Sequence, residues 1–288
     1  MRFVAFLTMA AAAVALAGRS ALAAAPNGND LVQAKLLADV DSVKPGKPFN
    51  LAIHFKIKPD WHLYWKYPGD AGLPPRVKWK LPDGFTASEF RFPIPVKDVL
   101  PGGIVAYAYH DELLLTATIT PPNNLDAGKP LTFAADLSWL VCETDLCLPG
   151  KATGVTVELP VGEAKPANGE LFDAWEPRFP RSPEQLTELV KQTGALPGTK
   201  LGVFVQWTAP VKDVAWFPNP PKGSGIENLQ ENTQTGLPGN VSAVMFNLVP
   251  APKSEAPMSF LVAFTDQDGK RHGVEFTVNL PLPAAEKK

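Results

Sequence analysis

Residues 131–142 read LTFAADLSWLVC and form the longest regular alternation in the chain. Apolar side chains occupy every second position from Leu131 to Val141, and mostly smaller or polar side chains stand between them. A period of two buries one row of side chains and leaves the other outside, as in the antiparallel sheets of a β-sandwich. The stretch therefore predicts a long β-strand that ends at Cys142.

Shorter alternations of the same kind lie on both sides of this strand. They cover residues 51–57, 77–81, 113–119 and 155–159, and towards the carboxyl end residues 201–207, 260–264 and 274–280. Turn sequences such as PDG, PGG and DQDG separate them, and the 31 Pro and 22 Gly form no tract. Short strands joined by turns are typical of sandwiches. We expect an all-β fold.

A polar stretch without periodicity, residues 161–169, divides the alternations into two groups. We place a domain boundary there because few core contacts are expected to cross such a segment. The sequence then predicts two β-sandwich domains, the first over residues 26–163 and a smaller second one over residues 170–288.

One helix is predicted, at the amino-terminal side of the second domain. Ser182 fits an N-cap, Pro183 the first helical position and Gln185 a capping box, and Gly194 is a suitable end. The apolar stripe of this helix would consist of Leu186, Leu189 and Val190.

The first 25 residues have the pattern of a secretory signal peptide. Arg2 precedes an apolar run over residues 3–18, and Ala21-Leu22-Ala23 offers the small side chains of a cleavage site. The run is shorter than the roughly 20 residues of a membrane span, although a retained anchor is the alternative. We expect an exported, periplasmic protein that is soluble and does not span the membrane after cleavage.

The charge balance makes some partners improbable. The chain has 27 basic and 29 acidic side chains, and loss of Arg2 and Arg19 with the leader leaves 25 and 29. A mildly negative protein is a poor ligand for nucleic acid or anionic lipid. No glycine-rich dinucleotide loop is present, so we expect no cofactor.

Cys142 and Cys147 are the only cysteines. As a structural bridge they would close so short a loop that the entropy gain is only about 2 kcal/mol. As a redox pair, their close spacing would let one thiol resolve a mixed disulfide made by the other. The spacing alone leaves both interpretations open. Glu143 and Asp145 between them raise thiol pKa values, so the pair is better suited to being attacked than to attacking.

Two thiolates and a histidine could also hold copper or zinc. The histidines show no pair at ligand spacing, so no metal ligand is predicted from the sequence. They are His54, His62, His110 and His272.

A second unusual stretch is WHLYWKYPGDAGLP, residues 61–74, in which four aromatic side chains precede a Pro/Gly-rich loop. A core strand that leads into a turn would explain it equally well. His62 by itself is typical of a structural histidine.

Taken with the WLVC end of residues 139–142 and Cys147-Leu148-Pro149, this stretch resembles one protein family. It is similar to the amino-terminal periplasmic region of the DsbD and ScsB type of thiol-disulfide reductases. The segments Trp79-Lys80-Leu81-Pro82 and Gly84-Phe85 add to the resemblance, which extends from about Asp30 to Pro160.

The resemblance implies an immunoglobulin-like sandwich with a reversible Cys142–Cys147 disulfide. Such a domain takes electrons from a thioredoxin-like partner domain and passes them to periplasmic client proteins, with Cys147 as the sulfur attacked and Cys142 as the resolving thiol. A cap loop is expected over residues 97–103, with Leu100 at its tip. The aromatic surround of the pair would consist of His62, Tyr64, Trp65 and Trp139.

Reductases of this family continue into a membrane domain and a thioredoxin domain. We therefore expect a separate membrane thiol reductase, with a thioredoxin-like domain, as the electron donor. The rival hypotheses are a non-enzymatic binding or assembly module with a structural disulfide, and a copper-binding module.

Overall fold

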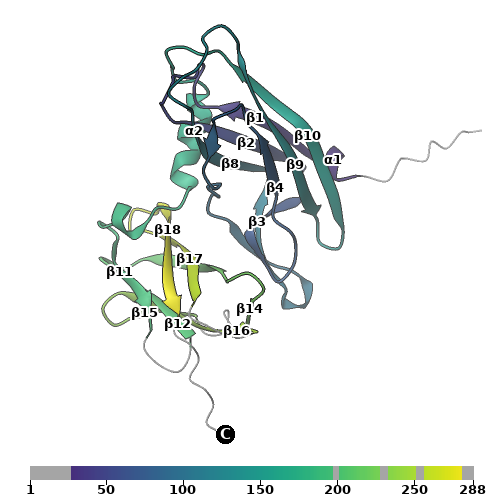
Figure 1. The fold of residues 1–288 in the computed structure, drawn as a ribbon. Coiled ribbons are helices and arrows are strands. Elements are labelled where there is room, and N and C mark those ends of the chain that lie inside the picture. Colours follow the sequence, from purple (N-terminus) through teal and green to yellow (C-terminus); the bar gives the residue numbers. More distant parts are fainter. Residues whose placement is uncertain (1–26, 197–200, 228–232, 251–255, 281–288) are drawn as a thin grey trace, which may run out of the picture.

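The computed structural model describes residues 27–196, 201–227, 233–250 and 256–280. The predicted signal peptide, residues 1–25, lies outside the described residues. The predicted all-β class is confirmed, because strands make up most of the described part (Figure 1). None of the helices in that part has the length and apolar character needed to cross a bilayer.

The first half is a sandwich of two antiparallel sheets, and a single helical turn, α1 (Gly28–Leu31), precedes it. The first sheet contains, in spatial order, β1 (Val32–Ala38), β2 (Phe49–Ile57), β8 (Glu112–Thr120) and β5 (Thr86–Ala87). The second sheet contains β10 (Cys147–Leu159), β9 (Leu131–Cys142), β3 (His62–Gly69), β7 (Val105–His110) and β6 (Val96–Val99), with β4 (Arg76–Lys80) also paired to β9.

The core of this half lies between the two sheets, as the alternation predicts. Phe133 of β9 packs edge-on against Phe49 of β2 with ring centroids 5.5 Å apart, and Trp139 packs in the same way against Phe55. All four side chains are buried. The odd-numbered positions of β9 therefore face inwards, and its even-numbered positions lie on the outer face of the second sheet.

The segment that follows β10 carries a helix that the periodicity did not predict. Helix α2 (Gly169–Trp175) continues into a 3₁₀ turn, η2 (Glu176–Arg178). Its Trp175, together with Phe179, packs on Ala52 and Leu114 at the outer face of the first sheet. The second half thus begins with a helix, but one that is fastened to the first half (Figure 1).

The predicted helix over residues 182–194 is wrong. Residues 183–185 form one 3₁₀ turn, η3 (Pro183–Gln185), with the expected capping box, and β11 (Val190–Ala195) is a strand. Leu186 is buried in the second core, and Val190 pairs with Trp207. Pairing along the edge of the neighbouring strand therefore overrides a weak local helical preference.

The second half is again built from two antiparallel sheets. The third sheet contains β11, β12 (Leu201–Trp207), β16 (Val241–Val249) and β14 (Gly225–Glu227), with β15 (Thr233–Leu237) also paired to β16. The fourth sheet contains β13 (Lys212–Asn219), β17 (Ala256–Thr265) and β18 (Arg271–Leu280). Buried aromatic and aliphatic side chains fill the space between the sheets.

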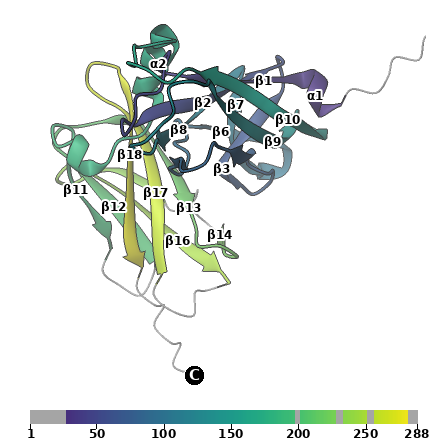
Figure 2. The ribbon, with the colours of Figure 1, turned by 45° about the horizontal axis from the view of Figure 1, so that its top comes forward.

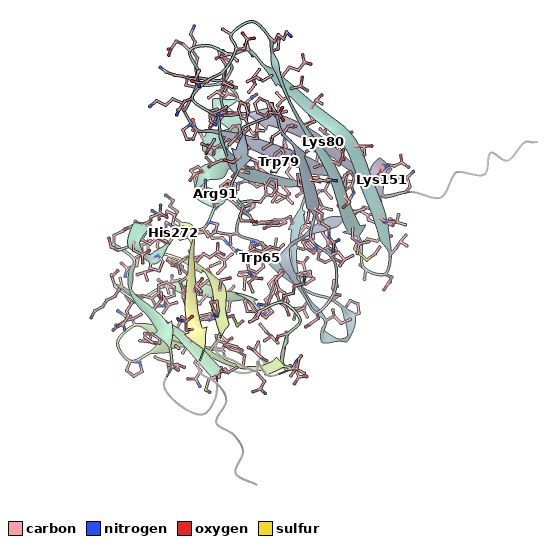
Figure 3. All side chains as sticks on the ribbon, viewed as in Figure 1. Trp65, Trp79, Lys80, Arg91, Lys151 and His272 are labelled. Atoms are coloured by element: carbon pink, nitrogen blue, oxygen red, sulfur yellow. A yellow bond between two sulfur atoms is a disulfide. The ribbon has the colours of Figure 1, made fainter. Side chains whose placement is uncertain are left out.

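The two halves share buried side chains where the fourth sheet meets β3 and β7. Figure 2 shows β13 of this sheet on the side of the second half that faces the first. Phe217 of β13 packs edge-on against Trp65 and Tyr107, with ring centroids 6.0 and 5.0 Å apart. Figure 3 shows Trp65 between the halves. Lys66 forms an ion pair with Glu275 beside this contact. The second half also has a core of its own. The predicted boundary at residues 161–169 stays a prediction.

Candidate functional site

The two cysteines face each other at the turn end of the hairpin formed by β9 and β10. Cys142 is the last residue of β9 and Cys147 the first of β10, and they are directly paired with a Cα–Cα distance of 4.1 Å. A disulfide joins them. The amide of Glu143 donates a hydrogen bond of 2.9 Å to the carbonyl of Leu146, which closes the turn between them.

The two sulfur-bearing residues differ in exposure. Cys142 is only 1% exposed, whereas Cys147 is exposed on the edge of the hairpin. Cys142 packs in a small cluster with Tyr64 and Ala106 on the outer face of the second sheet. An incoming thiolate can therefore approach the sulfur of Cys147, while the sulfur of Cys142 is covered by its neighbours.

The predicted aromatic surround divides between the two faces of this sheet. Tyr64 packs in the cluster of Cys142, and His62 is the Cα partner of Cys142 across β3 and β9. Trp65 and Trp139 belong to the main core on the opposite face. Strand alternation is the reason, because side chains one residue apart point to opposite sides.

Leu100 lies where a cap for the disulfide would be expected. It follows β6 and packs against the cluster of Tyr64, Ala106 and Cys142. Its amide donates a hydrogen bond of 2.8 Å to the carbonyl of Ile104, which holds the turn at η1 (Pro101–Gly103). The loop is thus a hairpin tip that packs on the cluster of the buried cysteine, and its role as a cap of the disulfide stays a prediction.

The Pro/Gly-rich loop after β3 covers Tyr64 from the other side. A Cβ atom at Gly72, where φ is +106°, would lie 2.3 Å from Cε1 of Tyr64, so only glycine fits there. Asp70 anchors the loop by accepting a 2.8 Å hydrogen bond from the amide of Val105. The unusual sequence after the four aromatic side chains therefore serves to enclose one of them.

A cluster of ionisable side chains adjoins the disulfide. His62 is paired in register with His110 of β7, and their ring centroids are 5.6 Å apart. Nε2 of His110 lies 2.8 Å from Oδ2 of Asp98 on β6. The hydroxyl of Tyr64 lies 3.1 Å from Nε2 of His62.

These contacts shift the acidity of the cluster. Burial, and after it the nearby His110, lowers the pKa of His62. The hydrogen bond with Asp98 raises the pKa of His110, and the same contact lowers the pKa of Asp98. Burial raises the pKa of Tyr64. At neutral pH the cluster therefore holds a neutral His62 beside a carboxylate.

Sequence reasoning missed Asp98 and the role of His110. The two histidines are far apart along the chain, and only the pairing of β3 with β7 brings them together. A usable signal was the turn sequence Pro101-Gly102-Gly103 between two short segments rich in apolar residues, which indicates a hairpin with Asp98 on one strand and His110 on the other.

Comparison with known proteins gives the following similarities. The family model described as "Thiol:disulfide interchange protein DsbD, N-terminal" matches residues 29–165. Among solved structures, the N-terminal periplasmic domain of ScsB from Proteus mirabilis is similar, with a TM-score of 0.62 and 17% identity over 88% of this chain and 95% of that chain. The likeness extends over both halves and shows a shared fold, which is immunoglobulin-like in the first half.

The N-terminal domain of DsbD from Neisseria meningitidis, in its reduced form, also matches, with a TM-score of 0.28 and 14% identity over 46% of this chain and 90% of that chain. No curated protein matches the chain at a significant level.

Proposed function

Because residues 29–165 are a DsbD-type amino-terminal domain, we propose that the protein relays electrons through the Cys142–Cys147 pair. Such a domain is a thiol-disulfide interchange module, and this one carries a disulfide. A thioredoxin-like domain of a membrane thiol reductase is the donor, and periplasmic proteins with disulfides are the clients. The predicted leader and the periplasmic domain named in the similar ScsB protein support this location.

The unequal exposure of Cys142 and Cys147 carries the proposal. Thiol-disulfide exchange requires a thiolate to approach one sulfur while the other leaves. Cys147 is exposed and Cys142 is 1% exposed. The bridge is thus arranged so that attack occurs at Cys147 and Cys142 is the leaving group.

The relay follows from this arrangement in balanced steps. A partner thiolate attacks Sγ of Cys147, a mixed disulfide forms as the Cys142–Cys147 bond breaks, and Cys142 takes up a proton from solvent. The partner's second thiolate then attacks the partner's first sulfur, the one bonded to Cys147 in the mixed disulfide. Cys147 is released, the partner is left oxidised, and the two electrons reside in the Cys142 and Cys147 thiols.

A client is reduced by the reverse sequence. The Cys147 thiolate attacks the client disulfide, and Cys142 then attacks Cys147 in the mixed disulfide, which releases the reduced client and restores the bridge. Cys142 lies next to Cys147 at all stages, so it is the natural resolving thiol.

Apolar side chains around the disulfide support docking of a partner. Val99 and Ile104 flank the tip of the cap loop and Leu146 precedes Cys147, with exposed fractions of 68%, 42% and 41%. Exposed apolar side chains grouped around a reactive bond are a common feature of protein contact sites. We expect the partner's active-site surface to cover this rim.

The redox potential of the pair tests the proposal. The full chain is equilibrated in glutathione or dithiothreitol buffers and the free thiols are counted. A relay requires a potential above about −300 mV, whereas a structural bridge lies below that value. A potential below it would favour the binding-module hypothesis with a structural disulfide.

Trapping of partners provides a second test with matched variants. Cys142→Ala, expressed in the native host, should accumulate a mixed disulfide through Cys147 that disappears with reductant. The adduct should contain a thioredoxin-fold protein or a client. Cys147→Ala should trap less, because the remaining thiol is buried. Absence of an adduct from both variants would contradict the relay.

A further inference from the structure

The cluster next to the disulfide has the composition of a metal site. His62 on β3, Asp98 on β6 and His110 on β7 each offer one ligand atom, and these atoms all lie within 4.8 Å of one another. The three residues come from three neighbouring strands, so the sheet itself holds their backbones in place. Their convergence is not a local accident of one loop.

The ligand atoms suit a borderline divalent ion. Two imidazole nitrogens and a carboxylate oxygen are a common protein ligand set for Zn²⁺. A tetrahedral Zn²⁺ with bonds of about 2.0–2.2 Å needs its ligand atoms roughly 3.4 Å apart. The present atoms lie within 4.8 Å of one another, so shifts of roughly 1–1.5 Å in the side chains would bring them to that spacing.

The surroundings of the cluster fit the same purpose. The hydroxyl of Tyr64, 3.1 Å from Nε2 of His62, orients that ring in the way that outer partners orient metal-binding histidines. The side chain of Asp98 is 25% exposed and that of His110 is 40% exposed. An ion can therefore reach the cluster from the solvent side of Asp98 and His110.

We propose that His62, Asp98 and His110 form a binding site for a Zn²⁺ ion, with the fourth coordination position open to solvent. The ion replaces the proton shared between His110 and Asp98. It lies beside the disulfide, because His62 is also the Cα partner of Cys142. The site does not depend on the relay, since none of its ligands is a cysteine.

Titration calorimetry with Zn²⁺ tests the site on the full chain, expressed without a histidine tag and with its disulfide intact. We expect one ion per chain. Asp98→Asn and His110→Ala should each weaken binding at least about tenfold, since changes even to outer partners of a metal cost that much. Circular dichroism establishes that each variant is folded.

Asp266→Asn is the matched control. It removes a carboxylate that contacts a histidine in the same way, with Oδ2 of Asp266 2.7 Å from Nε2 of His272, but the described residues place no second histidine in a metal-like group there. Zn²⁺ affinity should be unchanged in this variant. An equal loss of affinity in Asp266→Asn would overturn the assignment.

Two further measurements separate the site from the cysteines. Cys142→Ala combined with Cys147→Ala should keep its Zn²⁺ affinity, and Co²⁺ should give the visible absorption of a tetrahedral ion with nitrogen and oxygen ligands. The proposal fails if the unaltered chain binds no stoichiometric Zn²⁺, if both cluster variants bind normally, or if the double cysteine variant loses binding. None of these results depends on the redox potential of the bridge.

Discussion

At Cys142 and Cys147 the hairpin gives two chemically identical side chains different surroundings. Cys142 points to the covered outer face of the second sheet beneath Leu100, and Cys147 stands on its exposed edge. Because thiol-disulfide exchange depends on access as well as on thiolate content, this difference supports the proposed order of attack, with Cys147 first.

We predict unequal alkylation of the two thiols. In Cys142→Ala the remaining Cys147 should react with iodoacetamide at least about ten times faster than the remaining Cys142 reacts in Cys147→Ala, because access controls the reactivity of a thiol. Mass spectrometry of quenched time points measures both rates. Equal rates would show that the cap loop opens freely and does not protect Cys142.

Gly72 provides a second prediction at the residue scale. Gly72→Ala places a methyl group against the ring of Tyr64 and also occupies a φ of +106°. Gly102→Ala is the matched control, with φ of +81° and no atom within 4 Å of the new Cβ. The control should cost about 1–2 kcal/mol from backbone strain alone.

Gly72→Ala should cost more than the control, by about 1–3 kcal/mol for the overpacking. Denaturant unfolding of the two variants measures this difference. Gly72→Ala should also make the thiol of Cys142 easier to alkylate, because Tyr64 is one of the side chains that cover Cys142. Equal stability of the two variants would mean that Tyr64 moves aside without cost.

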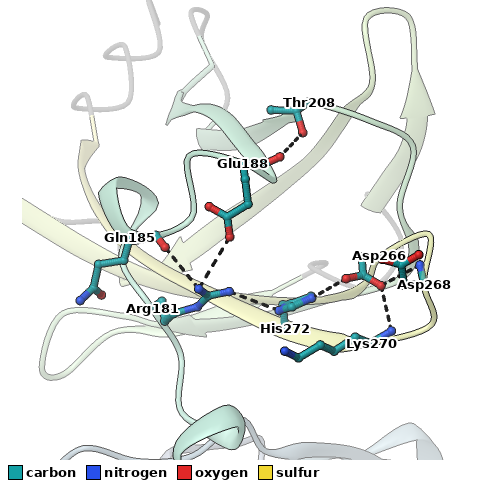
Figure 4. A network of polar contacts seen from close by, with 8 residues as sticks. All are labelled: Arg181, Gln185, Glu188, Thr208, Asp266, Asp268, Lys270 and His272. Atoms are coloured by element: carbon teal, nitrogen blue, oxygen red, sulfur yellow. Dashed lines mark hydrogen bonds and ion pairs between the residues drawn. The ribbon is translucent and has the colours of Figure 1, made fainter.

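The hairpin of β17 and β18 shows how one element is held by its turn. Asp266 accepts hydrogen bonds from the amides of Asp268 and Lys270, at 3.0 and 2.8 Å, and its Oδ2 lies 2.7 Å from Nε2 of His272 (Figure 4). The series of polar contacts continues from His272 to Arg181, and Arg181 forms an ion pair with Glu188. This network ties the start of the second half to the hairpin.

These contacts make the stability of the hairpin depend on pH. The hydrogen bond from His272, followed by that from Lys270, lowers the pKa of Asp266 below its ordinary value of 3.8. A group whose folded-state pKa is lowered contributes stability above its unfolded-state pKa, and that stability is lost as the pH falls through the folded-state value.

We therefore predict that Asp266→Asn lowers the melting temperature at pH 6 by a few degrees, and that the difference from the unaltered protein shrinks as the pH falls below 3.8, the ordinary pKa of this side chain. Asp268→Asn, in the same turn, is the control, because Asp266 accepts these three hydrogen bonds and Asp268 does not. Thermal melts over this pH range test the prediction. A difference that persists unchanged at low pH would exclude an electrostatic origin.

On the scale of the whole molecule, the two halves are joined by packing as well as by the chain. Phe217, Leu261 and Ala263 of the fourth sheet belong to the core that the first half builds around β3 and β7. Trp65 and Tyr107 are thus supported from both halves. The strand that bears His62 and Tyr64 at the site is the same strand that carries Trp65 at this junction.

We predict that Phe217→Ala destabilises the chain by about 3–5 kcal/mol, as large-to-small changes of buried Phe do. Phe246→Ala, which is equally buried but lies within the second core, is the matched control. Hydrogen exchange should accelerate in β3 and β7 for Phe217→Ala and in β12 and β16 for the control. If Phe217→Ala lowers the free energy of unfolding by less than about 1 kcal/mol, the junction is not tightly packed.

The sequence by itself determined the fold class and indicated the cysteine pair as the candidate site. Period-two alternation predicted the strand that ends at Cys142 and most of the other long strands, because a half-buried strand must alternate. The segments around Trp61, Trp79 and Cys142 indicated the family. Local capping signals at Ser182 did not determine a helix, because the unpaired edge of β12 offered Val190 hydrogen bonds and burial that a short helix could not match.

Only the tertiary structure decided which predicted side chains share the site. Alternation left His62 and Tyr64 beside Cys142 and sent Trp65 and Trp139 to the core, but which neighbours met them depended on strand order. The order β9, β3, β7, β6 brought Asp98 and His110 to His62. Strand order is set by the packing of whole sheets around a core, a long-range property that no local pattern of residues encodes.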